Sequence, residues 1–334
     1  MAKKATVREV ARLAGVSVGT VSNFLNKTKS IASETEGRIE AAIEQLGYIP
    51  NAGVRVMLGG RSHALAFLIP DSGNPFLAEV ARGIEDVAIS AGLVVVVCNT
   101  DGSTQREAHY ARVLSEMRVA GAIAMAVSAG ENALRRLESS GARVVVLGEQ
   151  VGSGFAAIDL ENAYGGYIAM RHLLDLGHTN VLFIGGPGAG PQLDDRYRGA
   201  RRACTERGLS AEMPIQINAD GNTTQARSTV AAEALRRYPE MTAALCANDL
   251  IALALRSVAV DAGLRIPEDL AIVGYDDIEQ ADSSPVPLTT VRLPQYELGV
   301  AAAKLVVALA DDSGSPPAPP RFTPELVVRA STQG

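Results

Sequence analysis

Apolar residues in the first 47 positions recur at helical spacing, in short stretches bounded by capping residues. Thr6 and Glu9 fit the capping-box pattern T-x-x-E, which predicts a helix over residues 7–13. Ser17 predicts the start of a second helix that continues to about residue 25, after a tight turn. Together with a third short helix within about the first 47 residues, they would make a complete small bundle.

That third helix is predicted to open at a second capping box, Ser33 and Glu36, and to end at Gly47. Pro50 then breaks the chain, and the pair Gly59-Gly60 precedes a change of rhythm. We therefore predict a three-helix domain over residues 1–48 and a hinge over residues 49–62.

From residue 64 onward, continuous apolar runs alternate with helical stretches, the latter at about 76–91, 104–118 and 131–140. The runs are ALAFLIP (64–70), LVVVVCN (93–99), GAIAMAV (121–127) and ARVVVLG (142–148). Strands that are apolar on both faces and alternate with helices are typical of a parallel sheet covered on both sides.

The same alternation returns after Asp159, at VLFIGG (181–186), PIQIN (214–218), AALCAN (243–248) and LAIVGYD (270–276). TTVRLP (289–294) is predicted to cross back, so that the helix over 296–310 rejoins the first half. We therefore predict two doubly wound parallel-sheet subdomains, the first from residues 63–160 and 293–330 and the second from residues 161–292.

The charge is unevenly distributed between these parts. Residues 1–62 hold nine Lys or Arg against five Asp or Glu, a net +4, whereas the rest holds 22 against 32, a net −10. A basic head on an acidic body favours local contact with a polyanion, although a chance skew in a short segment gives the same numbers. Three scattered cysteines in apolar surroundings indicate buried reduced thiols, and apolar runs of strand length with no signal-peptide pattern indicate a cytoplasmic protein without a membrane span.

The first two predicted helices fit a helix-turn-helix, in which the second helix enters the major groove of DNA. That helix offers small or hydrogen-bonding side chains that can approach phosphates and base edges: Ser17, Val18, Gly19, Thr20, Ser22 and Asn23. The alternative is a small helical bundle used for protein contact.

The whole chain resembles the lactose/galactose repressor family of bacterial transcription factors. The resemblance rests on TVREVARLAGVSVGTVSNFLN, GYIPN, LGH (176–178), Arg196 before Gly199, AND (247–249), VGYDD (273–277) and PLTTV (287–291). It implies a fold with a helix-turn-helix head on a periplasmic-binding-protein-like core. It also implies a homodimer that reads a roughly palindromic operator in double-stranded DNA.

In that family the positions of Val18, Gly19 and Asn23 select bases, and a hinge helix wedges an apolar side chain into the minor groove. The wedge falls at Met57 or at Leu58, while Gly53 weakens the hinge helix. By resemblance, further DNA contacts are expected from Thr6, Asn26, Tyr48, Asn51 and Arg55.

The resemblance also implies an effector, most readily a sugar or related metabolite, in the cleft between the subdomains. DSGNPF (71–76) follows the first strand of the core, at the carboxyl edge where such sheets bind ligands. The expected effector contacts are Asn74, Pro75, Phe76, Arg196, Asn248 and Asp276. Alone, each polar residue of this set is equally consistent with a surface charge or a helix cap.

Other chemistries are poorly supported by the sequence. GGPGAG (185–190) lacks both nucleotide-binding fingerprints, and His172 and His178 have the wrong spacing for one helical face. No catalytic set, metal site or cofactor site is predicted. Two alternative functions remain at this stage, a solute-binding protein for sugar transport, which leaves residues 1–62 unexplained, and a Rossmann-like enzyme.

Overall fold

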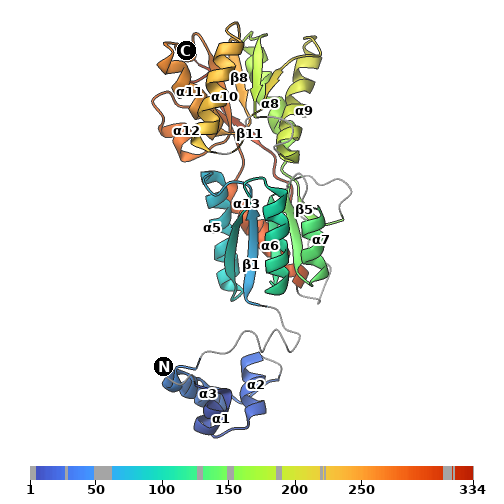
Figure 1. Cartoon of the computed structure of the whole chain (residues 1–334), viewed down its shortest axis with the longest axis vertical. Helices are drawn as coiled ribbons and strands as arrows, with labels where there is room; N and C mark the ends of the chain where they lie inside the picture. The colour runs from blue at the N-terminus through green and yellow to red at the C-terminus, as the bar shows by residue number, and fades with distance from the viewer. Residues whose placement is uncertain are drawn as a thin grey trace. The chain divides into compact units, whose positions relative to one another are not determined.

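The computed structural model describes residues 5–26, 29–48, 62–125, 131–148, 154–185, 190–218, 221, 223–310, 318 and 320–333. They form two compact units, Met1–Ser62 and His63–Gly334. Figure 1 shows a small all-helical unit and a larger unit in which helices flank two sheets. Among the described residues, no helix combines the length and apolar character needed to cross a membrane.

The first unit contains α1 (Val7–Ala14), α2 (Val18–Asn26) and α3 (Ser33–Leu46), which share a core of Val10, Ala11, Ala14, Val21, Ile39 and Ala42. The predicted Thr6 capping box is confirmed, because the Glu9 amide donates to Thr6 Oγ1 at 3.3 Å and the Thr6 amide donates to the Glu9 carboxylate at 2.8 Å. Ser17 Oγ accepts from the Thr20 amide at 3.0 Å and so caps α2 as expected.

The second predicted capping box is wrong. Helix α3 begins at Ser33 itself, and its N-cap is Ala32, which has no side chain that could accept a hydrogen bond. The acidic residues Glu34 and Glu36 in the first turn still suit the positive end of the helix dipole.

The first lobe of the larger unit is a five-stranded parallel sheet in the order β2-β1-β3-β4-β5. Its strands are β1 (Ala64–Ile69), β2 (Val94–Asn99), β3 (Gly121–Met125), β4 (Arg143–Leu147) and β5 (Ala156–Ile158). Helices α5 (Pro75–Ser90) and α13 (Gln295–Ala310) pack together on one face of this sheet. Helices α6 (Thr104–Glu116) and α7 (Glu131–Ser139) pack against each other as a second pair in the same lobe. The predicted return of the chain is thus confirmed for α13, which packs on β3, β4 and α5.

The second lobe is a six-stranded sheet in the order β11-β10-β9-β8-β6-β7, parallel except for the pair β10 and β11. The strands are β6 (Val181–Ile184), β7 (Ile215–Ile217), β8 (Ala243–Cys246), β9 (Ala271–Asp276), β10 (Thr289–Arg292) and β11 (Glu325–Val327). The helices are α8 (Asn162–Asp175), α9 (Pro191–Glu206), α10 (Thr224–Arg237), α11 (Asp249–Asp261) and α12 (Glu279–Ser283).

The assignment of residues 293–330 to the first subdomain is wrong for their last part. Strand β11 pairs antiparallel with β10, and the following Ser331 donates from Oγ to the Ile272 carbonyl at 2.5 Å. The tail therefore belongs to the second lobe, where it covers the edge that β10 would otherwise expose.

Candidate functional site

Helix α2 leaves its polar and small side chains outside the core of the helical unit. Ser17, Val18 and Gly19 are exposed, and Thr20, Ser22 and Asn23 are half-buried. Val18 is 43% exposed although it is apolar, whereas Val21 on the same helix is fully buried. A surface of this kind lets the helix approach DNA closely and leaves Val18 free for an apolar contact in the groove.

The remaining predicted DNA contacts are placed as follows. Thr6 is exposed, with its hydroxyl bound to Glu9, and Tyr48 is half-buried against the core of the helical unit. Asn26 ends α2, but its side chain lies outside the described residues, as do Asn51, Arg55, Met57 and Leu58 in full.

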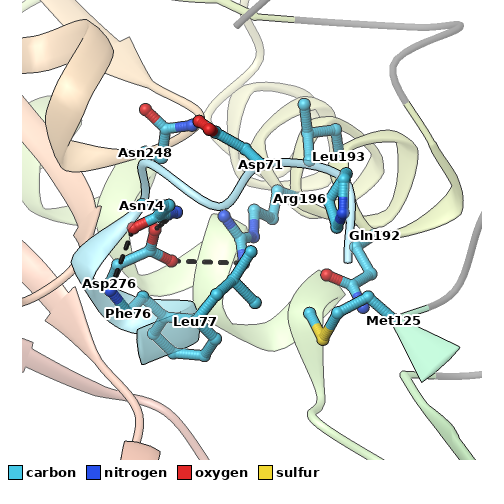
Figure 2. A pocket seen from close by; sticks show the side chains of 11 residues that line it. Asp71, Asn74, Phe76, Leu77, Met125, Gln192, Leu193, Arg196, Asn248 and Asp276 are labelled. Atoms are coloured by element: carbon cyan, nitrogen blue, oxygen red, sulfur yellow. Dashed lines mark hydrogen bonds and ion pairs between the residues drawn. The ribbon is translucent and has the colours of Figure 1, made fainter. Parts of the chain in front are cut away.

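A pocket lies between the two lobes of the larger unit (Figure 2). It encloses about 580 Å³, a volume that includes space open to solvent. The lining residues of the first lobe are Pro70, Asp71, Asn74, Phe76, Leu77 and Met125, and those of the second are Gln192, Leu193, Arg196, Asn248 and Asp276. They lie where strands end and helices begin, the usual ligand edge of such sheets.

Two amides in the pocket also cap helices. Asn74 Oδ1 accepts from the Phe76 amide at 3.0 Å and caps α5, while its Nδ2 donates to Asp276 Oδ2 of the other lobe at 3.1 Å. Asn248 Oδ1 accepts from the Ile251 amide at 2.9 Å and caps α11. Capping therefore fixes both side chains before any ligand is bound.

Arg196 is buried on α9, 5% exposed, and is held on every side. Its guanidinium donates to the Ala247 carbonyl at 2.5 Å and to Asn162 Oδ1 at 3.0 Å, and it lies 3.5 Å from the centre of the Tyr275 ring. Its Nη2 lies 3.6 Å from Asp276 Oδ1 (Figure 2). This network presents one edge of a preorganised cation to the pocket.

Close packing of α8 and α9 fixes the position of Arg196. A Cβ atom on Gly166 would lie 1.9 Å from the Arg196 carbonyl oxygen, and one on Gly199 would lie 1.8 Å from the Ala163 carbonyl oxygen. The two backbones therefore touch at glycines, and no larger residue fits at either position.

Asp276 is also buried, 3% exposed. Burial raises its pKa to about 6, although Arg196 and the hydrogen bond from Asn74 both act to lower it. A carboxyl with this pKa is mostly ionised at pH 7, so it mainly accepts hydrogen bonds from a ligand.

The backbone at Asp276 is strained and firmly held. Asp276 and Asp277 have φ of 109° and 53°, a region unusual for residues with side chains. The side-chain amide of Gln295 donates from Nε2 to the Asp276 carbonyl at 2.7 Å, and the backbone amide of Ile278 donates to Asp249 Oδ2 at 2.9 Å. Because the neighbouring helix α12 has Ile278 as its N-cap, Asp276 itself is not a helix cap.

Of the six predicted effector contacts, five line the pocket: Asn74, Phe76, Arg196, Asn248 and Asp276. Pro75 begins α5 and is half-buried but does not line the pocket. The pocket is also lined by residues that were not among the predicted contacts: Pro70, Asp71, Leu77, Met125, Gln192 and Leu193. Gln192 lies one helical turn before Arg196, and Met125 lies near the carboxyl end of a predicted strand, so both carried a usable signal.

Two of the histidines pair with threonine hydroxyls. His172 Nε2 and Thr332 Oγ1 are 2.8 Å apart, and His178 Nδ1 and Thr242 Oγ1 are 3.0 Å apart. Within the described ranges, no group of three or more His, Cys, Asp or Glu residues could hold a metal ion. Residues 186–189 of the glycine-rich loop lie outside those ranges.

Comparison with known proteins agrees with both units. Residues 6–51 match bacterial regulatory proteins, lacI family, and residues 170–332 match a periplasmic binding protein-like domain. The HTH-type transcriptional repressor PurR of Photobacterium profundum is 33% identical over 98% of this chain and 99% of its own length. The chain belongs to the lacI family of bacterial regulatory proteins.

Solved structures extend this comparison. A complex of the transcriptional regulator CelR with cellobiose is 27% identical, with a TM-score of 0.73 over 98% of this chain and 100% of the other. A LacI family regulator from Enterococcus faecium with bound ribose is 28% identical, with a TM-score of 0.73 over 80% of this chain and 98% of the other.

Family membership makes this chain a DNA-binding transcriptional regulator, neither an enzyme nor a transport protein. Its fold is a helix-turn-helix head on a periplasmic-binding-protein-like core of two sheet lobes.

Proposed function

We propose that this regulator is a cytoplasmic repressor that binds a roughly palindromic operator as a homodimer. A small effector that enters the pocket between its lobes raises or lowers its affinity for the operator. The observation that carries the proposal is the buried pair of Arg196 and Asp276, which faces a pocket between the two lobes. A ligand that contacts both lobes stabilises one lobe arrangement over another and thereby changes operator affinity.

The pocket chemistry favours a small, uncharged, polyhydroxylated effector such as a sugar. Asp71 and Asp276 are each paired with an arginine, so the lining has no surplus charge that would attract an ion. The amides Asn74, Gln192 and Asn248 offer both donors and acceptors to hydroxyl groups. Two regulators of similar fold bind cellobiose and ribose, respectively. Phe76 and Leu77 supply an apolar wall against which a sugar ring can lie.

The homodimer is supported by an apolar surface on the first lobe. Strand β2 is an edge strand, and its side chains Val94 and Val97 are 62% and 45% exposed. Ile89, near the end of the preceding helix α5, is 71% exposed. Exposed aliphatic side chains at a sheet edge are typical of a surface that a second copy covers.

The DNA-binding proposal is tested by selecting duplexes from a random library and measuring binding by gel shift. We expect inverted repeats, with an affinity that falls linearly with the logarithm of salt concentration. Val18→Ala should change the preferred base at one position of each half-site, whereas Leu13→Ala, on the exposed face of α1, should leave the preference unchanged. Affinity that is flat between low and moderate salt would contradict the proposal.

The effector proposal is tested by a thermal-shift panel of sugars, sugar phosphates, polyols, nucleosides and purines. A ligand at about 100 times its Kd stabilises the protein by roughly 2.7 kcal/mol. We expect a neutral sugar or polyol to raise Tm in the wild type and in Asp261→Asn, whose side chain is exposed on α11, and to have no effect in Asp276→Ala. Stabilisation by an anionic ligand, or one that survives in Asp276→Ala, would refute this effector class and this site.

A further inference from the structure

An ion pair joins the two lobes beside the pocket. Arg227 Nη2, on α10 of the second lobe, lies 2.5 Å from Asp71 Oδ2, in the loop that follows β1 of the first lobe. The Arg227 side chain is 11% exposed and the Asp71 side chain 19% exposed. An ion pair at this depth is screened by salt much less than a surface pair.

The place of Arg227 on its helix argues against a local role. It lies in the first turn of α10, where the helix dipole disfavours a cation. The positions three and four residues away on either side are Thr224, Thr223, Val230 and Ala231, none of them acidic. Arg227 is buried there because it reaches Asp71 across the cleft.

Asp71 carries this contact into the pocket. Its Oδ1 accepts from the Gly73 amide at 2.8 Å, and its carbonyl accepts from the Asn74 amide at 3.2 Å, so the carboxylate and the turn are one unit. Asn74, at the end of that turn, donates to Asp276 of the opposite lobe. Fixing Asp71 therefore fixes the distance across the pocket.

We propose that Arg227, which does not itself line the pocket, is a positioning residue that holds the loop of residues 71–74 against the second lobe and keeps the cleft closed before an effector binds. This inference rests on the proposed function only in taking the pocket as the effector site. With the pair intact, an effector enters a pocket whose two walls are already in register. Without it, part of the binding free energy is spent on closing the lobes.

The test measures the lobe separation without any ligand, so it is independent of the effector. Spin labels are attached to Gln105→Cys on α6 and Gln225→Cys on α10, both exposed, and the distance between them is measured by pulsed electron paramagnetic resonance in the full chain. Cys98, Cys204 and Cys246 are buried and do not compete for the label. Excess unlabelled protein ensures that most labelled chains pair with an unlabelled partner.

We expect one short distance in the wild type and a longer, broader distribution in Asp71→Asn and in Arg227→Gln. Asn at position 71 keeps an oxygen for the Gly73 amide, so that variant removes the charge and retains the turn. A charge-assisted hydrogen bond of this kind changes the ratio of closed to open molecules by about 10- to 150-fold. Arg227→Lys keeps the positive charge and should retain a distance close to that of the wild type.

Arg265→Gln is the matched control, because Arg265 pairs with Asp269 within the second lobe at 2.7 Å. This variant should leave the distance between the spin labels unchanged. The proposal is overturned if Asp71→Asn keeps the wild-type distance while its Tm shows that it is folded. It is equally overturned if Arg227→Gln folds and keeps the wild-type distance.

Discussion

Replacing Asp276 by Asn tests whether burial or the neighbouring arginine dominates the energy of the pocket carboxyl. In the folded protein the pKa of Asp276 is about 6, compared with an ordinary value of 3.8. Burial raises this pKa by more than Arg196 and Asn74 lower it. At pH 7 the protein therefore holds an ionised carboxylate in a place that favours the protonated form.

The magnitude follows from linkage. A shift of about two pKa units corresponds to about 3 kcal/mol, since each unit is worth roughly 1.4 kcal/mol. The folded state keeps this proton to higher pH than the unfolded state does. The contribution of Asp276 to stability is therefore full below about pH 4, falls between pH 4 and 6, and stays at its lower value above pH 6.

Asn cannot titrate and resembles the protonated acid. We therefore expect Asp276→Asn and the wild type to have similar free energies of unfolding at pH 4, with the difference moving in favour of the variant by about 3 kcal/mol as the pH rises to 7. Removing one partner of a buried ion pair often costs about 3–5 kcal/mol. Here that cost is offset, because Arg196 keeps Asn162, the Ala247 carbonyl and the Tyr275 ring, and its separation of 3.6 Å from Asp276 is too long for a hydrogen bond.

The assay is urea unfolding followed by circular dichroism at constant ionic strength from pH 4 to 7.5. Asp261→Asn removes an exposed carboxyl from the same lobe and should stay within about 0.5 kcal/mol of the wild type throughout. Parallel pH profiles for wild type and Asp276→Asn would show that the pKa of Asp276 is not raised. A variant that loses stability relative to the wild type as the pH rises would show that Arg196 outweighs burial.

Three local substitutions test the packing and capping described above. Thr6→Ala removes the capping box of α1 and should cost the helical unit about 1 kcal/mol, measured as faster amide hydrogen exchange in α1 with the core unchanged. Gly199→Ala should lower the free energy of unfolding in urea by at least the roughly 1–3 kcal/mol typical of overpacking, because the new methyl group meets the Ala163 carbonyl. Gly37→Ala adds a Cβ that meets nothing within 4 Å and should instead stabilise α3 by up to about 1 kcal/mol. Equal effects of Gly199→Ala and Gly37→Ala on stability would refute the packing argument.

The features that the sequence predicted well are those decided by neighbours along the chain. The capping box at Thr6 and Glu9 depends on residues three apart, and the buried strands show as unbroken apolar runs. Ser33 and Glu36 follow the same pattern as Thr6 and Glu9, yet α3 begins one residue earlier than that pattern requires. Whether such a residue caps a helix depends on its backbone conformation, which the pattern alone does not determine.

Features decided by distant residues were beyond the sequence. Strand β11 has three residues and owes its pairing to the edge of β10, so no periodicity marks it. Asp71 and Arg227 are 156 positions apart, and each alone is an ordinary charged residue. Five pocket residues were found because the resemblance supplied their grouping, whereas Gln192 needed the further step of following α9 back by one turn from Arg196.

The way the helices are joined determines how a signal can leave the pocket. In the first lobe, a Cβ on Gly83 would lie 2.2 Å from the Tyr296 carbonyl oxygen, and one on Gly299 would lie 2.0 Å from that of Val80, so α5 and α13 are in backbone contact, as α8 and α9 are in the second lobe. Pairs packed this closely do not slide, because any shift brings backbone atoms into collision. Asn74 caps α5, and Asp276 lies next to Arg196, which is on α9. A ligand that changes the distance between Asn74 and Asp276 therefore moves whole helix pairs. An effector can shift operator affinity only through contacts that differ between the two lobe arrangements, and the cross-cleft bonds of Asp71 and Asn74 are among the contacts available for this.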